Sequence, residues 1–175
     1  VDPTKQIGFP QSTIMKKIGL LSDIHGYWDP KFAHYFSSCD EIWIAGDIGD
    51  INVVENLEKI KPVKAVYGNI DCGEVRSRFH KTISFRVEEV KVIMTHIGGY
   101  PGKYAPGIKA LLYQEKPDLF VCGHSHILKA MFDRELRIMH LNPGAAGTYG
   151  FHKVRTLMRF EIEGKKIQNL EVIEL

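Results

Sequence analysis

Seven side chains that can bind a metal ion follow short apolar stretches of this sequence. They lie after five such stretches: Asp23, His25, Asp47, Asn69, His96, His124 and His126. Taken singly, an aspartate or asparagine after a strand is often a turn former, and a lone histidine is often a solvated or core residue. Because five stretches all end in this way, we expect these side chains to form one site.

The mixture of imidazole nitrogens with carboxylate and amide oxygens suits transition metals. Ca²⁺ prefers oxygen alone and Cu⁺ prefers sulfur. Seven ligands exceed one tetrahedral site, so we expect two divalent ions, manganese first, with nickel, zinc, iron or cobalt as alternatives. Paired ions lie ~3.5–4 Å apart and bind both the attacking and the leaving oxygen of a displacement at phosphorus. Asp47 is the best bridge between them, because its carboxylate has two oxygens.

The apolar stretches predict buried strands that position these side chains. Five are continuous and apolar, as expected of strands covered on both faces: 18–21, 42–45, 63–67, 92–94 and 119–122. Helix-like stretches lie between them at 30–37, 53–60 and 106–115. This order predicts parallel strands with right-handed crossovers, and ligands of such sheets bind beyond the carboxyl ends of the strands.

The region after Leu128 has a different pattern, which is rich in strands. Residues 154–162 largely alternate between apolar and polar side chains and are followed by a turn at Gly164. We therefore expect a second set of strands that packs on the first.

Length and composition are those of one globular domain, with 175 residues, 44% of them apolar and 25% charged. The net charge of +2 comes from scattered lysines and arginines, so nucleic acid is not expected as a partner. Three cysteines without CxxC spacing argue against a disulfide framework and a thiolate zinc site. No stretch reaches the ~18–20 apolar residues of a membrane span. We expect a cytoplasmic protein with no membrane partner.

The first residues differ from the rest. Residues 1–14 are polar, contain proline and show no periodicity, whereas Met15-Lys16-Lys17 precedes the first apolar stretch. We therefore expect residues 1–14 to be an appended or disordered leader and residues 15–175 to be the folded domain.

The residues around the seven side chains form motifs. These are Asp23-Ile24-His25, Gly46-Asp47-Ile48-Gly49-Asp50, Gly68-Asn69-Ile70-Asp71, His96 with Gly98, and Gly123-His124-Ser125-His126. In this order they resemble the calcineurin-like metallophosphoesterases, specifically their compact bacterial and archaeal phosphodiesterase branch. The resemblance covers nearly everything after Met15.

The resemblance implies a fold, a metal centre and an activity. The fold is α/β, a four-layer α-β-β-α sandwich of two mixed sheets flanked by helices. The first metal is bound by Asp23, His25 and His126, the second by Asn69, His96 and His124, and both by Asp47. The activity is hydrolysis of small-molecule phosphodiesters by a metal-bridging hydroxide, with Asp47, Asn69 and His96 as catalytic residues. The resemblance also implies a homo-oligomer.

Position 70 departs from the pattern of the family. Many members have a histidine there that protonates the leaving group, a contribution of ~10²–10⁴-fold for general acids. Ile70 cannot donate a proton. Because the small phosphodiesterase branch often lacks this histidine, we still expect hydrolysis, but not of esters with poor alkoxide leaving groups.

Several other residues have two interpretations each. Asp50 and Asp71 either orient the ligands or are ordinary loop carboxylates. Residues 141–145 resemble a loop close to the metal site in the same branch, or form a plain Pro-Gly turn. Arg76 and Lys103 either contact phosphate or are solvated surface charges. The remaining histidines match no motif: His34, His80, His140 and His152.

Two other functions are compatible with the same fold. A retromer subunit shares it and serves mainly as a protein-binding scaffold with a degraded metal site, whereas no ligand is degraded in this sequence. Nucleases of the superfamily have additional substrate-gripping segments, and this chain ends soon after one core of strands. The phosphodiesterase is therefore the preferred interpretation.

Overall fold

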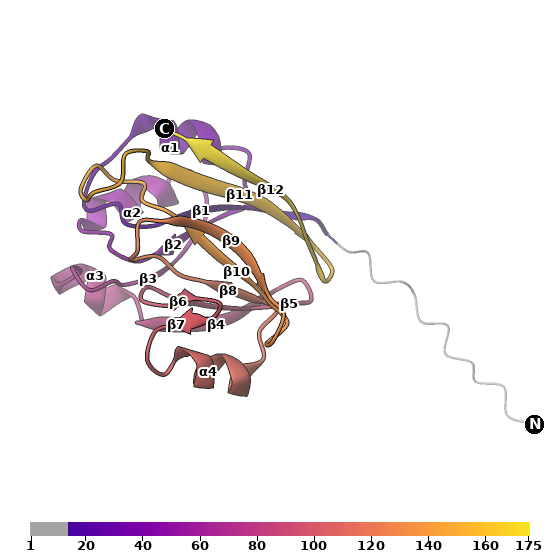
Figure 1. Ribbon diagram of the computed structural model, residues 1–175. Coiled ribbons are helices and arrows are strands. Elements are labelled where there is room, and N and C mark those ends of the chain that lie inside the picture. Colours follow the sequence, from indigo (N-terminus) through magenta and orange to yellow (C-terminus); the bar gives the residue numbers. More distant parts are fainter. Residues whose placement is uncertain (1–13) are drawn as a thin grey trace, which may run out of the picture.

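Two five-stranded sheets form the centre of the computed structural model, which describes residues 14–175 (Figure 1). The first sheet has the order β12-β11-β1-β2-β3. Its members are β1 (Lys16–Leu21), β2 (Glu41–Ala45), β3 (Val63–Val66), β11 (Thr156–Glu163) and β12 (Lys166–Glu174). Strands β1, β2 and β3 are parallel, whereas β11 pairs antiparallel with both β1 and β12.

The second sheet has the order β4-β5-β8-β10-β9. Its members are β4 (Thr82–Val87), β5 (Val90–Thr95), β8 (Leu119–Val121), β9 (Leu128–Asp133) and β10 (Ile138–Pro143). The three central strands are parallel, and the two outer strands are antiparallel to their neighbours. A separate two-stranded hairpin is made of β6 (Gly99–Tyr100) and β7 (Lys103–Tyr104).

Four short helices connect the strands: α1 (Pro30–Phe36), α2 (Ile51–Glu58), α3 (Gly73–Arg78) and α4 (Ile108–Glu115). Helices α1 and α2 lie on one side of the paired sheets and α4 on the other (Figure 1). The carboxylates of Asp29 and Asp50 cap the first two helices by accepting backbone N–H groups of their first turns. In residues 14–175, every helix is too short to cross a membrane.

Three apolar clusters define four layers. Phe32, Phe36 and Leu57 of the first two helices pack on one face of the first sheet. Trp43 and Phe160 lie in the cluster between the two sheets. The outer face of the second sheet packs against α4 in a third cluster that includes Phe120, Ile93 and Leu112. The fold class predicted from the sequence, a four-layer sandwich of two mixed sheets, is confirmed.

The register of the strands places the candidate ligands at one edge. Leu21 pairs with Ile44, and Ala45 pairs with Val66, so the loops after β1, β2 and β3 begin at the same level. In the second sheet, Met94 pairs with Val121, which brings together the loops after β5 and β8. The backbone N–H of Gly123 donates to the carbonyl of His96 at 2.9 Å.

The structure differs from the sequence-based expectation in how the later strands are divided. The alternating region forms the β11–β12 hairpin, which extends the first sheet instead of the second. The second sheet starts earlier, at β4, and it includes β9 and β10. Helix α3 and strand β4 were not expected, because α3 has only six residues and β4 alternates at a partly exposed edge. Apart from Ile14, the expected leader lies outside the described residues.

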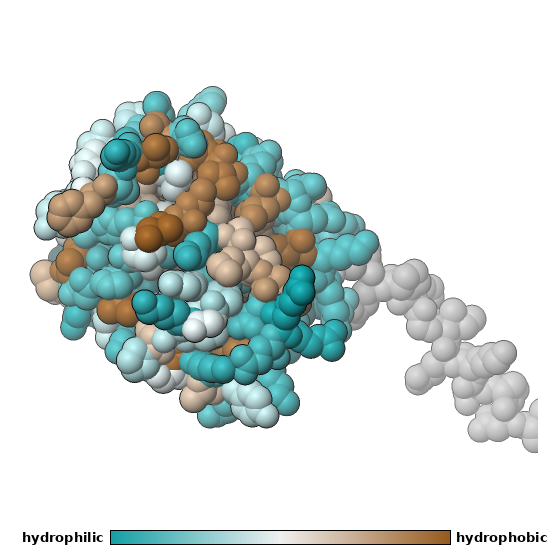
Figure 2. Space-filling model, in the orientation of Figure 1, coloured by the Kyte–Doolittle hydropathy of each residue, from teal (hydrophilic) through white to brown (hydrophobic). Residues whose placement is uncertain are grey.

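The surface contains apolar side chains that the fold leaves exposed. The face shown in Figure 2 is mostly hydrophilic, with hydrophobic residues gathered in its upper part. Both β9 and β12 are edge strands, and they expose large apolar side chains: Leu128, Met131, Phe132, Leu170 and Val172. These exposed edges are relevant to the expected homo-oligomer, which stays a prediction.

Candidate metal centre

Three candidate ligands from two loops form a first group. The ligand atoms of Asp23, His25 and His126 all lie within 4.8 Å of one another. Asp23 is fully buried after β1, and its Oδ1 atom lies 3.2 Å from Nε2 of His126. The other oxygen of Asp23 accepts the backbone N–H of His124 at 3.0 Å. One carboxylate oxygen is therefore used by the backbone, and the other faces the group.

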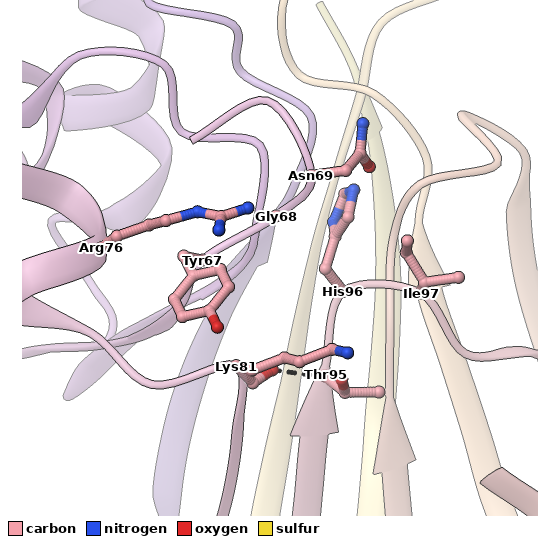
Figure 3. Close-up of a pocket in the computed structure, with 8 residues that line it drawn as sticks. All are labelled: Tyr67, Gly68, Asn69, Arg76, Lys81, Thr95, His96 and Ile97. Atoms are coloured by element: carbon pink, nitrogen blue, oxygen red, sulfur yellow. Dashed lines mark hydrogen bonds between the residues drawn. The ribbon is translucent and has the colours of Figure 1, made fainter. Parts of the chain in front are cut away.

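A second group lies beside the first. The ligand atoms of Asp47, His96 and His124 also lie within 4.8 Å of one another. Nε2 of His96 is 3.2 Å from Oδ1 of Asp47. Asn69 is exposed and lies next to His96 at the rim of a pocket (Figure 3). All seven residues predicted from the sequence are thus brought to one end of the two sheets.

Asp47 lies between the two groups. Its Oδ2 atom is 3.7 Å from Nε2 of His25, which belongs to the first group. Its Oδ1 atom is 3.2 Å from Nε2 of His96, which belongs to the second. Oδ1 also accepts the backbone N–H of Ile70 at 3.1 Å. Each carboxylate oxygen therefore faces a different group, as a bridging ligand requires.

Buried polar atoms within the two groups test whether metal ions fit there. Oδ1 of Asp23 and Nε2 of both His25 and His96 are buried and make no hydrogen bond within residues 14–175. Buried polar atoms without a partner are rare, because each one loses its bonds to water. These three atoms all face the interior of the groups, and nitrogen with oxygen donors suits divalent transition metals. The residues present therefore fit metal ions.

The backbone of the candidate ligands is strained. Five of them have a left-handed conformation: Asp23 (φ 53°), His25 (51°), Asp47 (49°), His124 (69°) and His126 (57°). Side chains other than glycine rarely adopt it, and each instance costs about 1–3 kcal/mol. Such strain is concentrated at functional sites, where other interactions hold the residue in place. The clustering supports a functional interpretation of these loops.

Asp71 holds two of the ligand loops together. Its carboxylate is buried and accepts the backbone N–H groups of Ile48, Gly49 and Gly68 at 3.1, 2.7 and 2.7 Å. Ile48 and Gly49 directly follow Asp47, and Gly68 directly precedes Asn69. Asp50, in contrast, is exposed and caps α2 by accepting the N–H of Asn52. Of the two aspartates with two interpretations, only Asp71 positions ligands.

The segment 141–145 supports the fifth ligand loop, which follows β8. The side-chain amide of Asn142 donates to the carbonyl of Gly123 at 2.9 Å and to Oγ of Ser125 at 3.1 Å. Its carbonyl oxygen accepts the N–H of Gly144 at 3.0 Å. Asn142 and Pro143 belong to β10, so the segment is the end of a strand and not a plain turn. It orients the loop that contains His124 and His126.

Glycine is required beside two ligands because their side chains fill the space of a Cβ atom. A Cβ on Gly68 would lie 2.0 Å from Oδ1 of Asp47. A Cβ on Gly46 would lie 2.5 Å from Nδ1 of His96, and Gly46 also has a φ of 91°. Gly46 and Gly68 therefore leave the space that the side chains of His96 and Asp47 occupy.

The two aspartates have opposite pKa shifts. Burial raises the pKa of Asp23 to about 6, although the charge of His96 works against this effect. Burial also disfavours the charged form of Asp47, but the interaction with His96 outweighs it and lowers the pKa of Asp47. A positive ion beside Asp23 favours its charged form.

Burial lowers the pKa of three of the candidate histidine ligands, His25, His124 and His126. The neutral imidazole is the form that binds metal. Burial acts in the same direction on His96, but the interactions with Asp47 and Asp23 outweigh it and raise the pKa of His96. Nδ1 of His96 lies 2.7 Å from the carbonyl of Ala45, so this nitrogen is the donor and Nε2 remains available to a metal.

His152 was missed by the sequence analysis. Its Nδ1 atom lies 3.3 Å from Nδ1 of His126, and its Nε2 atom lies 2.9 Å from the carbonyl of Gly147. Because a carbonyl only accepts, Nε2 of His152 has the proton and Nδ1 accepts from His126. Nε2 of the neutral His126 ring then has no proton, so its lone pair, which faces Asp23, is available to a metal ion. A metal-binding histidine generally needs a hydrogen-bond partner for its second ring nitrogen. This general need is the only feature by which the sequence could have indicated a role for His152.

We expect His152→Ala to weaken binding of one metal ion by about 10–100-fold, because partners that orient a ligand histidine contribute that much to affinity. Calorimetric titration with Mn²⁺ measures the effect. His34→Ala, an exposed histidine of α1, is the control and should leave both binding events unchanged. His152→Gln retains an acceptor and should recover part of the loss. Equal affinities in the wild type and His152→Ala would contradict the orienting role.

Of the other residues singled out in the sequence, His140 and Lys103 have no contact with the groups, whereas Arg76 lies beside the second group. His140 is fully buried against Phe120, and burial lowers its pKa to about 4, so it is a neutral core residue. Lys103 is exposed on β7. Arg76 lines the pocket that also contains Asn69 and His96 (Figure 3).

Comparison with known proteins identifies the family. The Calcineurin-like phosphoesterase superfamily domain matches residues 15–165. A curated "Probable metallophosphoesterase" of Methanothermobacter thermautotrophicus is 30% identical over 160 residues, 86% of this chain and 88% of the relative. Another "Probable metallophosphoesterase", from Methanocaldococcus jannaschii, is 28% identical over 164 residues, 90% of this chain and 81% of the relative.

Solved structures share the fold at lower identity. Vacuolar Protein Sorting 29 (Vps29) of Cryptosporidium parvum has a TM-score of 0.71 and 18% identity, covering 92% of this chain and 98% of that chain. Vps29 of Entamoeba histolytica in complex with Zn²⁺ has a TM-score of 0.71 and 15% identity, covering 91% and 98%. A predicted phosphoesterase of Streptococcus pneumoniae has a TM-score of 0.64 and 17% identity, covering 93% and 99%. By its sequence match, this chain belongs to the calcineurin-like phosphoesterase superfamily.

Proposed function

We propose that this chain is a phosphodiesterase that depends on two divalent metal ions. The observation that supports it best is the position of Asp47, whose two oxygens face two separate groups of buried ligands. The donor atoms are nitrogen and oxygen, so manganese is the first candidate, with nickel, zinc, iron and cobalt as alternatives. A neighbour of the same fold, Vps29 of Entamoeba histolytica, is described with Zn²⁺.

The proposed ligands divide between the two ions. Asp23, His25 and His126 belong to the first ion, and His96 and His124 belong to the second. Asn69 is the remaining ligand of the second ion, which its place beside His96 supports. Asp47 is shared.

Divalent ions bound at these groups would lower the pKa of a water molecule and would provide positive charge for the phosphoryl oxygens. The residues of the chain prepare the site for this chemistry. Asp71 fixes the loops of Asp47 and Asn69, and the carbonyl of Ala45 fixes the ring of His96. Asp47, Asn69 and His96 are the proposed catalytic residues, because two of them border a pocket and Asp47 joins the two groups.

A diester with a good leaving group is the proposed substrate. Ile70 follows the proposed ligand Asn69, and it is 43% exposed. Because isoleucine has no acidic proton, this position provides no proton donor for the leaving group. A leaving group of low pKa departs without a proton, so the absence of a proton donor slows its departure least. The scattered charge of the chain supports a small molecule as substrate over nucleic acid. Cytoplasmic location and homo-oligomer formation remain proposals of the same kind.

We expect metal-loaded protein to contain about two transition-metal ions per chain, since the candidate ligands overfill one site. Elemental analysis after saturation with Mn²⁺ and removal of loose metal measures this number. The alternatives lead to other results. A value near zero would favour a protein-binding scaffold, and cleavage of single- or double-stranded DNA would favour a nuclease.

A further inference from the structure

A small pocket opens beside the second ligand group. Asn69 and His96 form one part of its wall, and Tyr67, Arg76 and Lys81 form another (Figure 3). Its volume is about 150 Å³. Pockets that hold drug-sized ligands measure ~300–1,000 Å³, so this one accommodates a single small group. Any substrate held by His96 and Asn69 has this pocket next to it.

The two basic side chains of the pocket have no acidic partner. Within residues 14–175, no carboxylate lies within ion-pair distance of Arg76 or Lys81, and the pocket wall contains no acidic residue. Among the described residues, six other lysine and arginine side chains form ion pairs. Arg78, on the same helix as Arg76, lies 2.6 Å from a carboxylate oxygen of Glu58. Within the described residues, Arg76 and Lys81 therefore have no ion-pair partner, whereas Arg78 has one.

The basic groups are held in place without an ion pair. Nε of Arg76 donates to the backbone carbonyl of Asp71 at 2.6 Å, and its guanidinium lies over the ring of Tyr67 at 4.7 Å. Within the part of the chain that the structure describes, the terminal nitrogens of the guanidinium make no hydrogen bond. This planar fork suits an anion with several oxygens. The backbone carbonyl of Lys81 accepts the hydroxyl of Thr95 at 3.1 Å, which fixes the base of the lysine (Figure 3).

We propose that this pocket binds a second anionic group of the substrate, such as a phosphate, sulfonate or carboxylate. The preferred substrates are then phosphodiesters that have another negative charge a few bonds from the ester. This inference rests on the proposed phosphodiesterase function. The tethered anion lies between Arg76 and Lys81 while the phosphodiester lies at His96 and Asn69.

Two synthetic diesters with the same leaving group test the proposal. One is 4-nitrophenyl 3-sulfopropyl phosphate and the other is 4-nitrophenyl butyl phosphate, which lacks the second charge. A sulfonate is a poor metal ligand, so its effect reports on the pocket and not on the ions. We expect kcat/KM for the sulfonate to be higher by roughly tenfold at low ionic strength, the upper range for ion pairs with two exposed residues such as Arg76 and Lys81. The ratio should fall in added salt, which screens such pairs.

Variants of Lys81 make the test specific, because its side chain is exposed and forms no hydrogen bond with any residue of 14–175, so the substitutions should not affect folding. Lys81→Gln should lower the ratio of the two kcat/KM values, and Lys81→Glu should lower it further, below one. The control is Arg134→Gln, which removes an exposed arginine in the turn between β9 and β10 and should leave the ratio unchanged. A ratio that is insensitive to Lys81 and Arg76, or a wild-type ratio near one, would overturn the proposal.

Failure of the proposed function would give a different result, since neither diester would then be cleaved. In that case calorimetry with two inert ligands, 3-phosphonopropanesulfonate and butylphosphonate, still decides the question. Tighter binding of the sulfonate by wild type but not by Lys81→Glu supports the pocket, and equal binding overturns it.

Discussion

Asp47→Ala is expected to lower the rate of phosphodiester hydrolysis by at least about 10³-fold and to weaken the binding of both metal ions. The side chain has one oxygen facing His25 and the other facing His96, so its loss affects both ligand groups. Metal ions contribute several kcal/mol to the transition state, and each 1.36 kcal/mol is a factor of ten in rate. Steady-state kinetics and calorimetric metal titration together measure the two effects.

His126→Ala is the informative comparison, because His126 belongs to one group only. It should weaken one binding event and leave the other close to that of the wild type. Asp47→Asn retains the size of the side chain and tolerates the left-handed backbone at this position, so it separates loss of charge from misfolding. Asp50→Asn is the control, since Asp50 only caps α2 and asparagine also caps helices. If Asp47→Ala still binds two ions tightly, Asp47 is not the bridge.

The sequence predicted the central strands because their signal is local. A continuous apolar run that is followed by an aspartate or a histidine is visible within ten residues, and β1, β2, β5 and β8 all begin within three residues of the expected position. The partner of the β11–β12 hairpin is not a local property. Met158, Phe160 and Ile162 alternate equally well on either sheet, and only the pairing with β1 places them between the two sheets.

The candidate ligands could be selected from the sequence, whereas the sequence left open which residues position them or, for His152, assigned no role. Asp50 and Asp71 follow their motifs in the same way, yet one caps a helix and the other accepts three backbone N–H groups. Asn142 and His152 reach the ligand loops from distant segments, 19 and 26 residues from the residues they contact. Such contacts depend on tertiary packing, which residue type and spacing do not encode locally.

Ile70→His is expected to accelerate the hydrolysis of alkyl phosphodiesters more than that of aryl phosphodiesters. In the wild type, aryl esters should be the better substrates by a large factor, because nitrophenolate departs without a proton and an alkoxide does not. The backbone N–H of Ile70 donates to Oδ1 of Asp47 at 3.1 Å, and its side chain is 43% exposed. A histidine at this position therefore starts beside the site and has room to reach the leaving oxygen.

The expected gain is smaller than the full factor of a general acid. Asp71, the neighbouring carboxylate that a new histidine would need as an orienting partner, is buried and already accepts three backbone N–H groups. A misplacement of ~1 Å can cost ~10²-fold, so about tenfold is realistic out of the ~10²–10⁴-fold of general acids. The measurement is kcat/KM for a series of leaving groups, plotted against leaving-group pKa.

The slope of that plot distinguishes proton donation from other effects of the substitution. A new acid should make the dependence on leaving-group pKa less steep in Ile70→His than in the wild type. Ile70→Gln is the matched control, because its amide is polar but cannot donate a proton to an alkoxide, and it should keep the wild-type slope. Metal content must be equal in all three proteins, since the backbone N–H of residue 70 donates a hydrogen bond to the proposed bridging ligand Asp47. Equal slopes in the wild type and Ile70→His would mean that position 70 does not face the leaving group, or that another residue already provides the proton.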